Sequence, residues 1–287
     1  MTAAFSKAPY SLQVERLIEL AIDEDIGHGD ITTAALDMEE VSGTAVIVSK
    51  EQLVVAGLEM VRRVYEKLDS DVFFLPIVSD GQLVEPEVRV AEISANIGTL
   101  LSGERIALNF LQRLSGIATN VRAYADSLPD LRVRIADTRK TAPGWRVLEK
   151  YAVRAGGAFN HRMGLFDGVL IKDNHIAACG SVKKAVEKAR ASVSHLIKIE
   201  VETENHGQIK EALDAGADVI MLDNMNREDI EQAVKIIDGK ALVEVSGRID
   251  REGLKHLCSA GVDIISAGAL THAARSVDLS MYIEPLK

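Results

Sequence analysis

The second half of the chain contains six short apolar segments: RVRIAD (132–137), GVLIKD (168–173), LIKIEVE (196–202), DVIMLD (218–223), ALVEVS (241–246) and DIISAG (263–268). Segments with helical patterns, such as VKKAVEKARAS and HGQIKEALDAG, lie between them. Apolar strands that alternate with helices are typical of βαβ units and of a parallel sheet that is covered on both faces. We therefore expect an α/β fold in this half of the chain.

The number of these units favours an open barrel over a closed one. The strand-and-helix units fit into about 150 residues, whereas a complete eight-fold α/β barrel takes about 200 residues or more. A doubly wound sheet is the rival architecture, but no GxGxxG motif follows the first strand, which weakens a dinucleotide-binding interpretation. We therefore expect an open, incomplete α/β barrel with parallel strands.

The first part of the chain has a mixed pattern of helices and strands. Helical spacing occurs at residues 11–24, 58–68 and 102–128, with Ser11 and Ser102 as candidate N-caps. Strand-like runs lie between these helices, at 44–50, 52–57, 72–78 and within 83–98. An N-terminal α+β domain is therefore expected.

Composition excludes several classes of protein. The 287 residues are 47% apolar and 26% charged, which is enough apolar material for a sizeable core. The net charge of −10 argues against a general binder of nucleic acid or acidic membranes. The sequence has no run of about 18 apolar residues that would predict a membrane-spanning helix, and its N-terminus lacks the apolar core of a secretory signal. Two cysteines, Cys179 and Cys258, cannot form a disulfide framework, so we expect a cytoplasmic protein.

Positive charge is concentrated in one segment. Residues 132–172 hold nine Lys or Arg residues against three Asp or Glu residues, so the rest of the chain is strongly acidic. A basic segment in an acidic protein indicates a local site for an anion, although solvated helix faces would give the same count.

Each of the six apolar segments ends in a polar residue or a glycine. The carboxyl ends of parallel strands meet at one edge of the sheet, where loops converge and sites form. Strand ends also meet solvent, so any single one of these residues has a structural explanation, but together they predict one shared site. The residues are Asp137, Lys172 with Asp173, Glu202, Asp223 with Asn224, Ser246 with Gly247, and Gly268.

Three kinds of group at these ends suggest three binding functions. Glu202 and Asp223 end neighbouring strands, and paired carboxylates can hold vicinal sugar hydroxyls or Mg²⁺. The glycines of VSGRIDREGL and SAGALTHAA lie between a strand and a helix start, where backbone N–H groups favour phosphate. A cluster of cations needs an anionic ligand to offset the cost of burying it. That cluster comprises Arg139, Lys140, His161, Arg162 and Lys172.

The segment DTRKTAPGWRVLEKYAVRAGGAFNHRMGLFDGVLIKDNHI (137–176) strongly resembles the quinolinate phosphoribosyltransferases. Further motifs carry the same resemblance in the same order along nearly the whole chain. They are EDIGHGDITT (24–33), GERIALNFLQRLSGIAT (103–119), IEVET (199–203), MLDN (221–224), EVSG (244–247) and GVDIISAGALTH (261–272).

This resemblance implies a reaction and an architecture. Quinolinate, 5-phosphoribosyl-1-pyrophosphate (PRPP) and Mg²⁺ would give nicotinate mononucleotide, pyrophosphate and CO₂ in NAD biosynthesis. An N-terminal α+β domain (1–115), joined by the C-terminal tail (276–287), would accompany an open α/β barrel domain (116–275). The resemblance also implies a homodimer, or a hexamer of dimers, in which the partner's N-terminal domain covers each barrel mouth.

The resemblance also implies a role for each candidate residue. Arg139, His161, Arg162 and Lys172 would hold the two carboxylates of quinolinate, and Arg105 would reach that site from the neighbouring subunit. Lys140, Glu202 and Asp223 would be catalytic: Lys140 would extend toward the PRPP phosphate, and the two acids would hold the ribose hydroxyls with Mg²⁺ nearby. The phosphate turns would comprise Ser246, Gly247, Arg248, Gly268 and Ala269.

Three alternatives stay open. A molybdenum-transport-associated paralogue shares the fold of this family. A barrel lyase could use Lys172 or Lys140 as a Schiff-base nucleophile. An anion-binding protein of the same fold would bind quinolinate or phosphate without releasing pyrophosphate.

Overall fold

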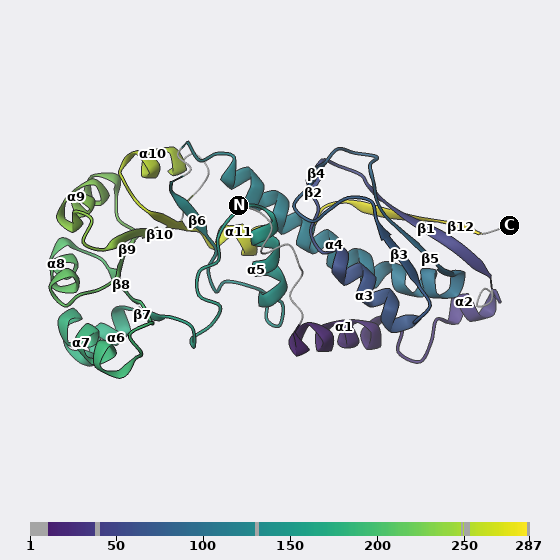
Figure 1. Ribbon diagram of the computed structural model, residues 1–287, viewed down its shortest axis with the longest axis horizontal. Helices are drawn as coiled ribbons and strands as arrows, with labels where there is room; N and C mark the ends of the chain where they lie inside the picture. The colour runs from purple at the N-terminus through teal and green to yellow at the C-terminus, as the bar shows by residue number, and fades with distance from the viewer. Residues whose placement is uncertain (1–10, 38–40, 130–131, 248, 250–252, 286–287) are drawn as a thin grey trace. The chain divides into compact units, whose positions relative to one another are not determined.

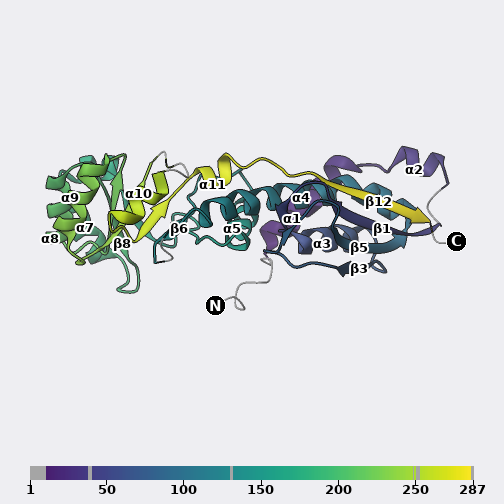
Figure 2. The same cartoon turned by 90° about the horizontal axis from the view of Figure 1, so that it is seen from above.

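The computed structural model describes residues 11–37, 41–129, 132–247, 249 and 253–285 (Figures 1 and 2). The chain forms two compact units. The first comprises residues 1–122, 141–157 and 270–287, and the second comprises 123–140 and 158–269.

The first unit contains a four-stranded antiparallel sheet in the order β12-β1-β5-β3. Its strands are β1 (Ser42–Ser49), β3 (Phe73–Pro76), β5 (Arg89–Asn96) and β12 (Leu279–Pro285). A separate pair consists of β2 (Leu53–Val54) and β4 (Leu83–Val84). The last strand of the chain thus lies directly beside the first one, with Ser49 opposite Leu279 (Figure 1).

Helices pack around this sheet: α1 (Leu12–Asp25), α2 (Ile31–Ala35), α3 (Leu58–Leu68), α4 (Ile97–Ala125) and α5 (Arg146–Ala155). Ser11 caps α1 as expected, because its side chain accepts a hydrogen bond from the N–H of Val14. The expectation that Ser102 caps the long helix is wrong. The helix α4 begins at Ile97, where Asn96 Oδ1 accepts a hydrogen bond from the N–H of Thr99 at 2.7 Å, and the Ser102 hydroxyl contacts Asp30 instead.

The helix α4 also explains why the compact units divide the chain differently from the expected boundary at residues 115 and 116. That boundary falls inside α4, which continues to Ala125. Arg113 on this helix pairs with the buried Glu149 of α5 at 2.8 Å, so α5 belongs to the first unit. At Gly116, any side chain would begin 1.9 Å from the carbonyl oxygen of Arg275, so the return of the chain to the first unit requires a glycine here.

The second unit contains a parallel sheet of six strands in the order β6-β11-β10-β9-β8-β7. The order ends at β6 and β7, and these two edges do not pair with each other among the described residues. The expectation of an open α/β barrel is therefore confirmed. The strands are β6 (Arg134–Ala136), β7 (Val169–Ile171), β8 (Ile199–Thr203), β9 (Val219–Asp223), β10 (Leu242–Ser246) and β11 (Ile264–Ser266).

Helices cover the outer face of this sheet (Figure 1). Side chains on that face are apolar and buried, as at Val201, Ile220 and Val245, because successive strand residues point to opposite faces. The helices are α6 (Asp173–Cys179), α7 (Val182–Ser192), α8 (His206–Asp214), α9 (Arg227–Ile237) and α10 (Gly253–Ser259), and α11 (Ala269–His272) follows the last strand. In the part of the chain that the structure describes, no helix combines the length and the apolar character needed to span a bilayer.

Candidate active site

The inner face of the barrel sheet carries polar residues among apolar ones such as Val219 and Met221. Strand register places Glu200 and Glu202 of β8 on the same face as Asp223 of β9, Glu244 and Ser246 of β10, and Ser266 of β11. Glu200, Glu244 and Ser266 are more than nine-tenths buried, and each has an oxygen atom with no hydrogen-bond partner among the described residues. Buried polar atoms are normally satisfied, so this face has the character of a polar binding site rather than of a core.

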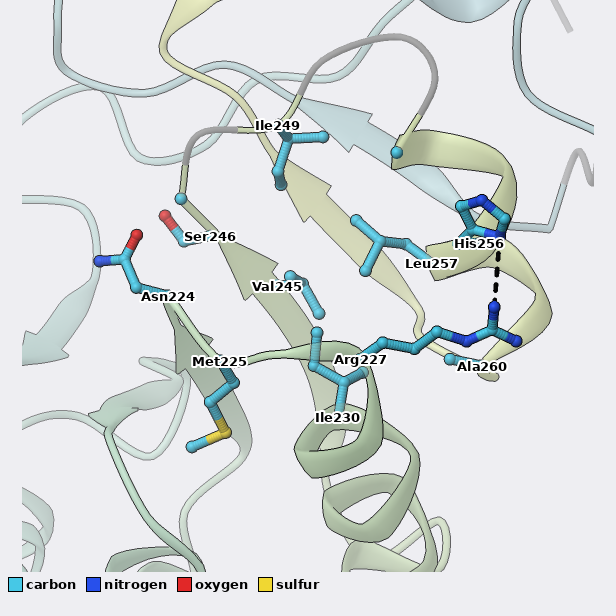
Figure 3. Close-up of a pocket in the computed structure, with 12 residues that line it drawn as sticks. Asn224, Met225, Arg227, Ile230, Val245, Ser246, Ile249, His256, Leu257 and Ala260 are labelled. Carbon is cyan, nitrogen blue, oxygen red and sulfur yellow. Dashed lines mark hydrogen bonds between the residues drawn. The ribbon is translucent and has the colours of Figure 1, made fainter.

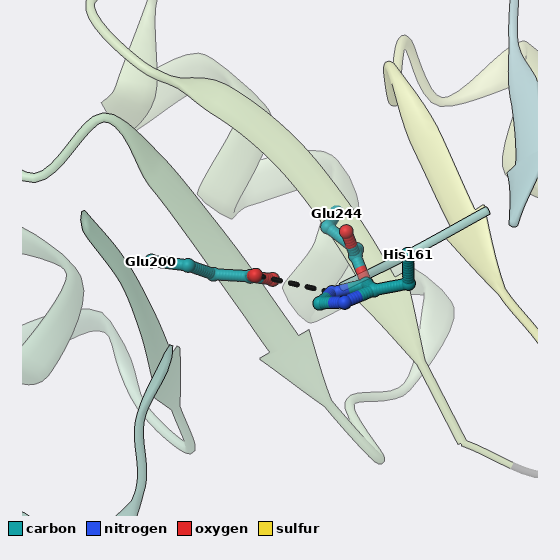
Figure 4. Close-up of side chains that lie close together, drawn as sticks. All are labelled: His161, Glu200 and Glu244. Carbon is teal, nitrogen blue, oxygen red and sulfur yellow. Dashed lines mark ion pairs between the residues drawn. The ribbon is translucent and has the colours of Figure 1, made fainter. Parts of the chain in front are cut away.

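His161 lies on this inner face, between two of the buried acids (Figure 4). Its Nε2 atom is 3.1 Å from Glu200 Oε2 and 3.5 Å from Glu244 Oε1. Burial lowers the pKa of His161, whereas the two carboxylates raise it. Burial raises the pKa of Glu200. All three ligand-type atoms lie within 4.8 Å of one another, but the 3.1 Å separation between His161 Nε2 and Glu200 Oε2 is that of a hydrogen bond, which the Nε2–H group donates.

The segment that carries His161 is held at its backbone. The N–H of His161 donates to Asp137 Oδ1 at 2.9 Å, and the side-chain amide of Asn160 donates to Asp137 Oδ2 at 2.6 Å. The N–H of Arg162 donates to His161 Nδ1 at 2.7 Å. Both ring nitrogens of His161 therefore contact protein groups in this geometry, and its direct contact with a substrate carboxylate stays a prediction.

Arg139 and Arg162 place two positive charges close together. Arg162 is half-buried, and its guanidinium donates to the carbonyl oxygen of Gly168 at 3.1 Å. Burial and the charge of Arg139 together lower the pKa of Arg162. Two like charges that repel each other attract an anion, because its binding relieves both the repulsion and the desolvation.

Lys172 and Glu202 form an ion pair between the ends of β7 and β8. The carboxylate of Glu202 thus contacts the ammonium group of Lys172. The carboxylate of Asp223 instead accepts a hydrogen bond from the side-chain amide of Asn224 at 2.8 Å. A Schiff-base nucleophile needs a neutral amine beside a carbonyl group, and Lys172 lies against a carboxylate instead.

The turn after β10 brings Ser246 and Gly247 to the carboxyl edge of the sheet, where Asp223 pairs with Ser246. Gly247 has a φ of +150°, and a side chain there would begin 2.9 Å from Asn224 Oδ1, so the turn requires a glycine. A cavity of about 380 Å³ adjoins this turn, between α9 and α10 (Figure 3). Its walls include Ile230, Val245 and Leu257, and Arg227 lies 3.4 Å from His256 at its edge.

The structure brings some of the predicted site residues together and leaves others apart. The second unit brings together Arg139 with Arg162, His161 with the inner face, Lys172 with Glu202, and Asp223 with Ser246. Lys140 is exposed beside Arg139, Gly268 is buried and Ala269 is half-buried. Arg105 lies on α4 of the first unit, where its side chain is 58% exposed. Arg248 lies outside the described residues.

Glu200 and Glu244 are residues of this site that sequence reasoning missed. Each stands two positions before a predicted residue, Glu202 and Ser246, on the same face of its strand. The available signal was an acid in the middle of an apolar strand, in KIEVE and LVEVS. A charged residue at such a position is costly unless it is paired.

Two family models match adjacent parts of the chain. The model of the quinolinate phosphoribosyl transferase N-terminal domain matches residues 30–115, and that of the C-terminal domain matches residues 117–282. Among curated proteins, the chain is 45% identical to the probable nicotinate-nucleotide pyrophosphorylase [carboxylating] of Bacillus subtilis, over 94% of this chain and 93% of that protein. It is 41% identical to the protein of the same name from Methanocaldococcus jannaschii, over 93% and 96% of the two chains.

Solved structures agree with these matches. The crystal structure of NadC from Streptococcus pyogenes superposes with a TM-score of 0.94 at 41% identity, over 98% of this chain and 100% of that one. A nicotinate-nucleotide pyrophosphorylase from Francisella tularensis superposes with a TM-score of 0.91 at 40% identity. Both domain models and relatives that match along almost their full length show that the chain belongs to the quinolinate phosphoribosyl transferase family.

Proposed function

We propose that the protein is a carboxylating nicotinate-nucleotide pyrophosphorylase. It transfers the phosphoribosyl group of PRPP to quinolinate and releases pyrophosphate and CO₂, which yields nicotinate mononucleotide for NAD biosynthesis. The main structural observation behind this proposal is that the cations Arg139 and Arg162 interact electrostatically in the unit whose strands β8 and β9 carry the acids Glu202 and Asp223 at their carboxyl ends. The curated relatives that carry this activity in their names match the chain over nine-tenths of its length.

The two carboxylates of quinolinate account for the cations. Arg139, Arg162 and Lys172 bind them in this proposal, with His161 beside Arg162. Arginine suits a planar carboxylate because its guanidinium donates two parallel hydrogen bonds. Arg105 completes the site from a second copy of the chain, so the working enzyme is a homodimer or a larger assembly of dimers.

The strand-end acids and turns account for PRPP. Glu202 and Asp223 accept hydrogen bonds from the ribose hydroxyls, and Lys140 contacts phosphate. The turns at Ser246, Gly247 and Arg248, and at Gly268 and Ala269, bind the phosphate groups. Gly247 lies between β10 and α10 with a φ of +150°, and backbone N–H groups at a turn of this kind can bind an anion.

The residues present also fit Mg²⁺. Glu202 and Asp223 offer carboxylate oxygens at the carboxyl ends of neighbouring strands, and hard oxygen donors of this kind suit Mg²⁺ together with substrate phosphates. Bound Mg²⁺ would neutralise negative charge on the pyrophosphate leaving group.

The reaction proceeds in two stages. In the first, the bond between ribose C1 and pyrophosphate breaks, and the pyridine nitrogen of quinolinate forms the new bond to C1. The cations of the site orient the ring for this attack and stabilise the charge that develops. In the second, the positively charged ring accepts the electron pair of the bond to the C2 carboxylate, CO₂ leaves, and a proton replaces it at C2.

One assay tests the proposal. The protein is incubated with PRPP, Mg²⁺ and quinolinate labelled in its C2 carboxylate, and labelled CO₂, pyrophosphate and nicotinate mononucleotide are measured. Equal amounts of the three products are expected, with none after Mg²⁺ is removed by EDTA and none when nicotinate replaces quinolinate. Tight quinolinate binding without pyrophosphate release would overturn the proposal in favour of an anion-binding protein. We also propose a cytoplasmic location, because phosphorylated substrates such as PRPP do not cross membranes.

A further inference from the structure

The buried acids Glu200 and Glu244 have no task in the reaction described above, yet they stand at the centre of the inner face. They come from β8 and β10 and approach the same atom, His161 Nε2, at 3.1 and 3.5 Å (Figure 4). Their side chains are 10% and 3% exposed, so solvent does not share in this contact.

Stability alone does not explain this arrangement. A buried carboxylate is often less stabilising than an apolar side chain of the same volume, because it loses its hydration. The outer face of the same strands shows that alternative, with Val201 and Val243 fully packed. In addition, Glu200 Oε1 has no hydrogen-bond partner among the described residues, which adds a further cost.

The His161 ring connects these acids to the cation that binds substrate. Its Nε2 edge faces the carboxylates, and its Nδ1 edge accepts the N–H of Arg162 at 2.7 Å. The Arg162 guanidinium in turn donates to Gly168 at 3.1 Å. If the ring rotated, the N–H of Arg162 would lose its hydrogen bond to His161 Nδ1, and the backbone of Arg162 would no longer be held in place.

We infer that Glu200 and Glu244 are positioning residues that fix the orientation of the His161 ring and, through it, place Arg162 for the carboxylates of the substrate. This inference rests on the proposed function. A displacement of a binding group by about 1 Å can reduce a rate about 100-fold, so a loss of this support has a measurable effect. Other charged groups near the segment are Asp137, which holds the His161 backbone, and Arg139 and Asp167, which act on Arg162.

The experiment is a double-mutant cycle between Glu200 and His161 in the full-length protein. Glu200→Leu removes the acceptor and is expected to raise the Michaelis constant for quinolinate about 10- to 100-fold while that for PRPP stays within about twofold. Glu200→Gln keeps an oxygen acceptor at the same place and is expected to recover most of the loss. In the His161→Asn background, Glu200→Leu is expected to have little further effect, because the two residues act through one contact.

Two results would overturn the inference. One is an equal rise in the Michaelis constants for both substrates, and the other is an undiminished effect of Glu200→Leu when His161 is already replaced. Glu231→Leu, on the outer helix α9, serves as a matched control that is expected to change neither constant. Thermal melting shows whether Glu200→Leu folds. If it does not, Glu200→Gln and Glu244→Gln are compared instead. In these variants, ¹⁵N spectra of the His161 ring report the orientation of the ring. A wild-type protein that releases no CO₂ from quinolinate refutes the proposed function, whereas an active wild type with unaffected variants refutes this inference alone.

Discussion

Replacement of Arg162 by methionine is expected to separate activity from stability. Methionine keeps most of the side-chain length but removes the guanidinium. The Arg162 guanidinium donates a hydrogen bond to the carbonyl oxygen of Gly168, and such a bond contributes about 0.5–1.5 kcal/mol to the free energy of unfolding. The loss of repulsion from Arg139 offsets part of this, so unfolding free energy should fall by about 1 kcal/mol at most.

Activity should fall much further. A preorganised donor to a charged group is worth about 2–4 kcal/mol of transition-state stabilisation, which is about 30- to 900-fold in kcat/KM. Arg162→Lys should recover only part of the loss, because an ammonium group keeps the charge but not the paired hydrogen bonds. Steady-state release of pyrophosphate measures activity, and urea unfolding measures stability.

Arg190→Met is the matched control. Arg190 also belongs to the second unit, where it pairs with Asp218 at 2.6 Å just before β9, at the opposite end of the strands. Its replacement should leave kcat/KM within about twofold of the wild-type value. Arg162 would not act on the substrate as proposed if Arg162→Met kept kcat/KM within threefold of wild type, or if Arg162→Met and Arg190→Met lost activity equally.

Three further predictions concern other contacts. Gly247→Ala should raise the Michaelis constant for PRPP and leave that for quinolinate unchanged, because the new Cβ atom would stand 2.9 Å from Asn224 Oδ1 in the turn proposed to bind phosphate; equal changes in both constants would contradict this. Tyr151→Phe should lower the free energy of unfolding by about 1–3 kcal/mol in urea titrations and leave catalysis unchanged, because it removes a hydrogen bond to the buried carboxyl of Asp80, whose pKa burial raises; an unchanged urea midpoint would count against that contact. Burial raises the pKa of Asp218, but the hydrogen bond from the backbone N–H of Ile199 opposes burial, and the pKa lies below its usual value. The Asp218 carboxylate therefore stabilises the fold above about pH 4, and this stabilisation is lost as the pH falls further. The difference in melting temperature between wild type and Asp218→Asn should therefore narrow below about pH 4, and a difference independent of pH would show that the charge is not involved.

The sequence predicts the barrel well because its strands are local features. Each apolar segment, such as DVIMLD at 218–223, carries its own pattern and contains a strand. The strand bounds lie within one or two residues of the expected ones, except that β8 begins at Ile199, three residues after the start of LIKIEVE. Helix starts depend on single contacts and are harder to place. Ile97 lies in the region 83–98 where strands are expected, but it packs in the core within the first turn of α4, and the Asn96 cap fixes that choice.

The site could be predicted only in part. Lys172 and Glu202 are conspicuous because they end strands, and the structure pairs them. Glu200 and Glu244 are separated by 44 positions in sequence and meet only because β8 and β10 lie on either side of β9. Contacts of this kind depend on strand order and on the face that each residue occupies, and neither follows from the local pattern.

A crystal structure of the protein with bound quinolinate is the decisive test of the proposed site. Quinolinate is expected on the inner face of the barrel sheet, with its two carboxylates against Arg139 and Arg162 and its ring nitrogen toward Glu202 and Asp223. Quinolinate bound outside the barrel, or bound inside it with both guanidinium groups turned away from its carboxylates, would show that these cations do not form the substrate site.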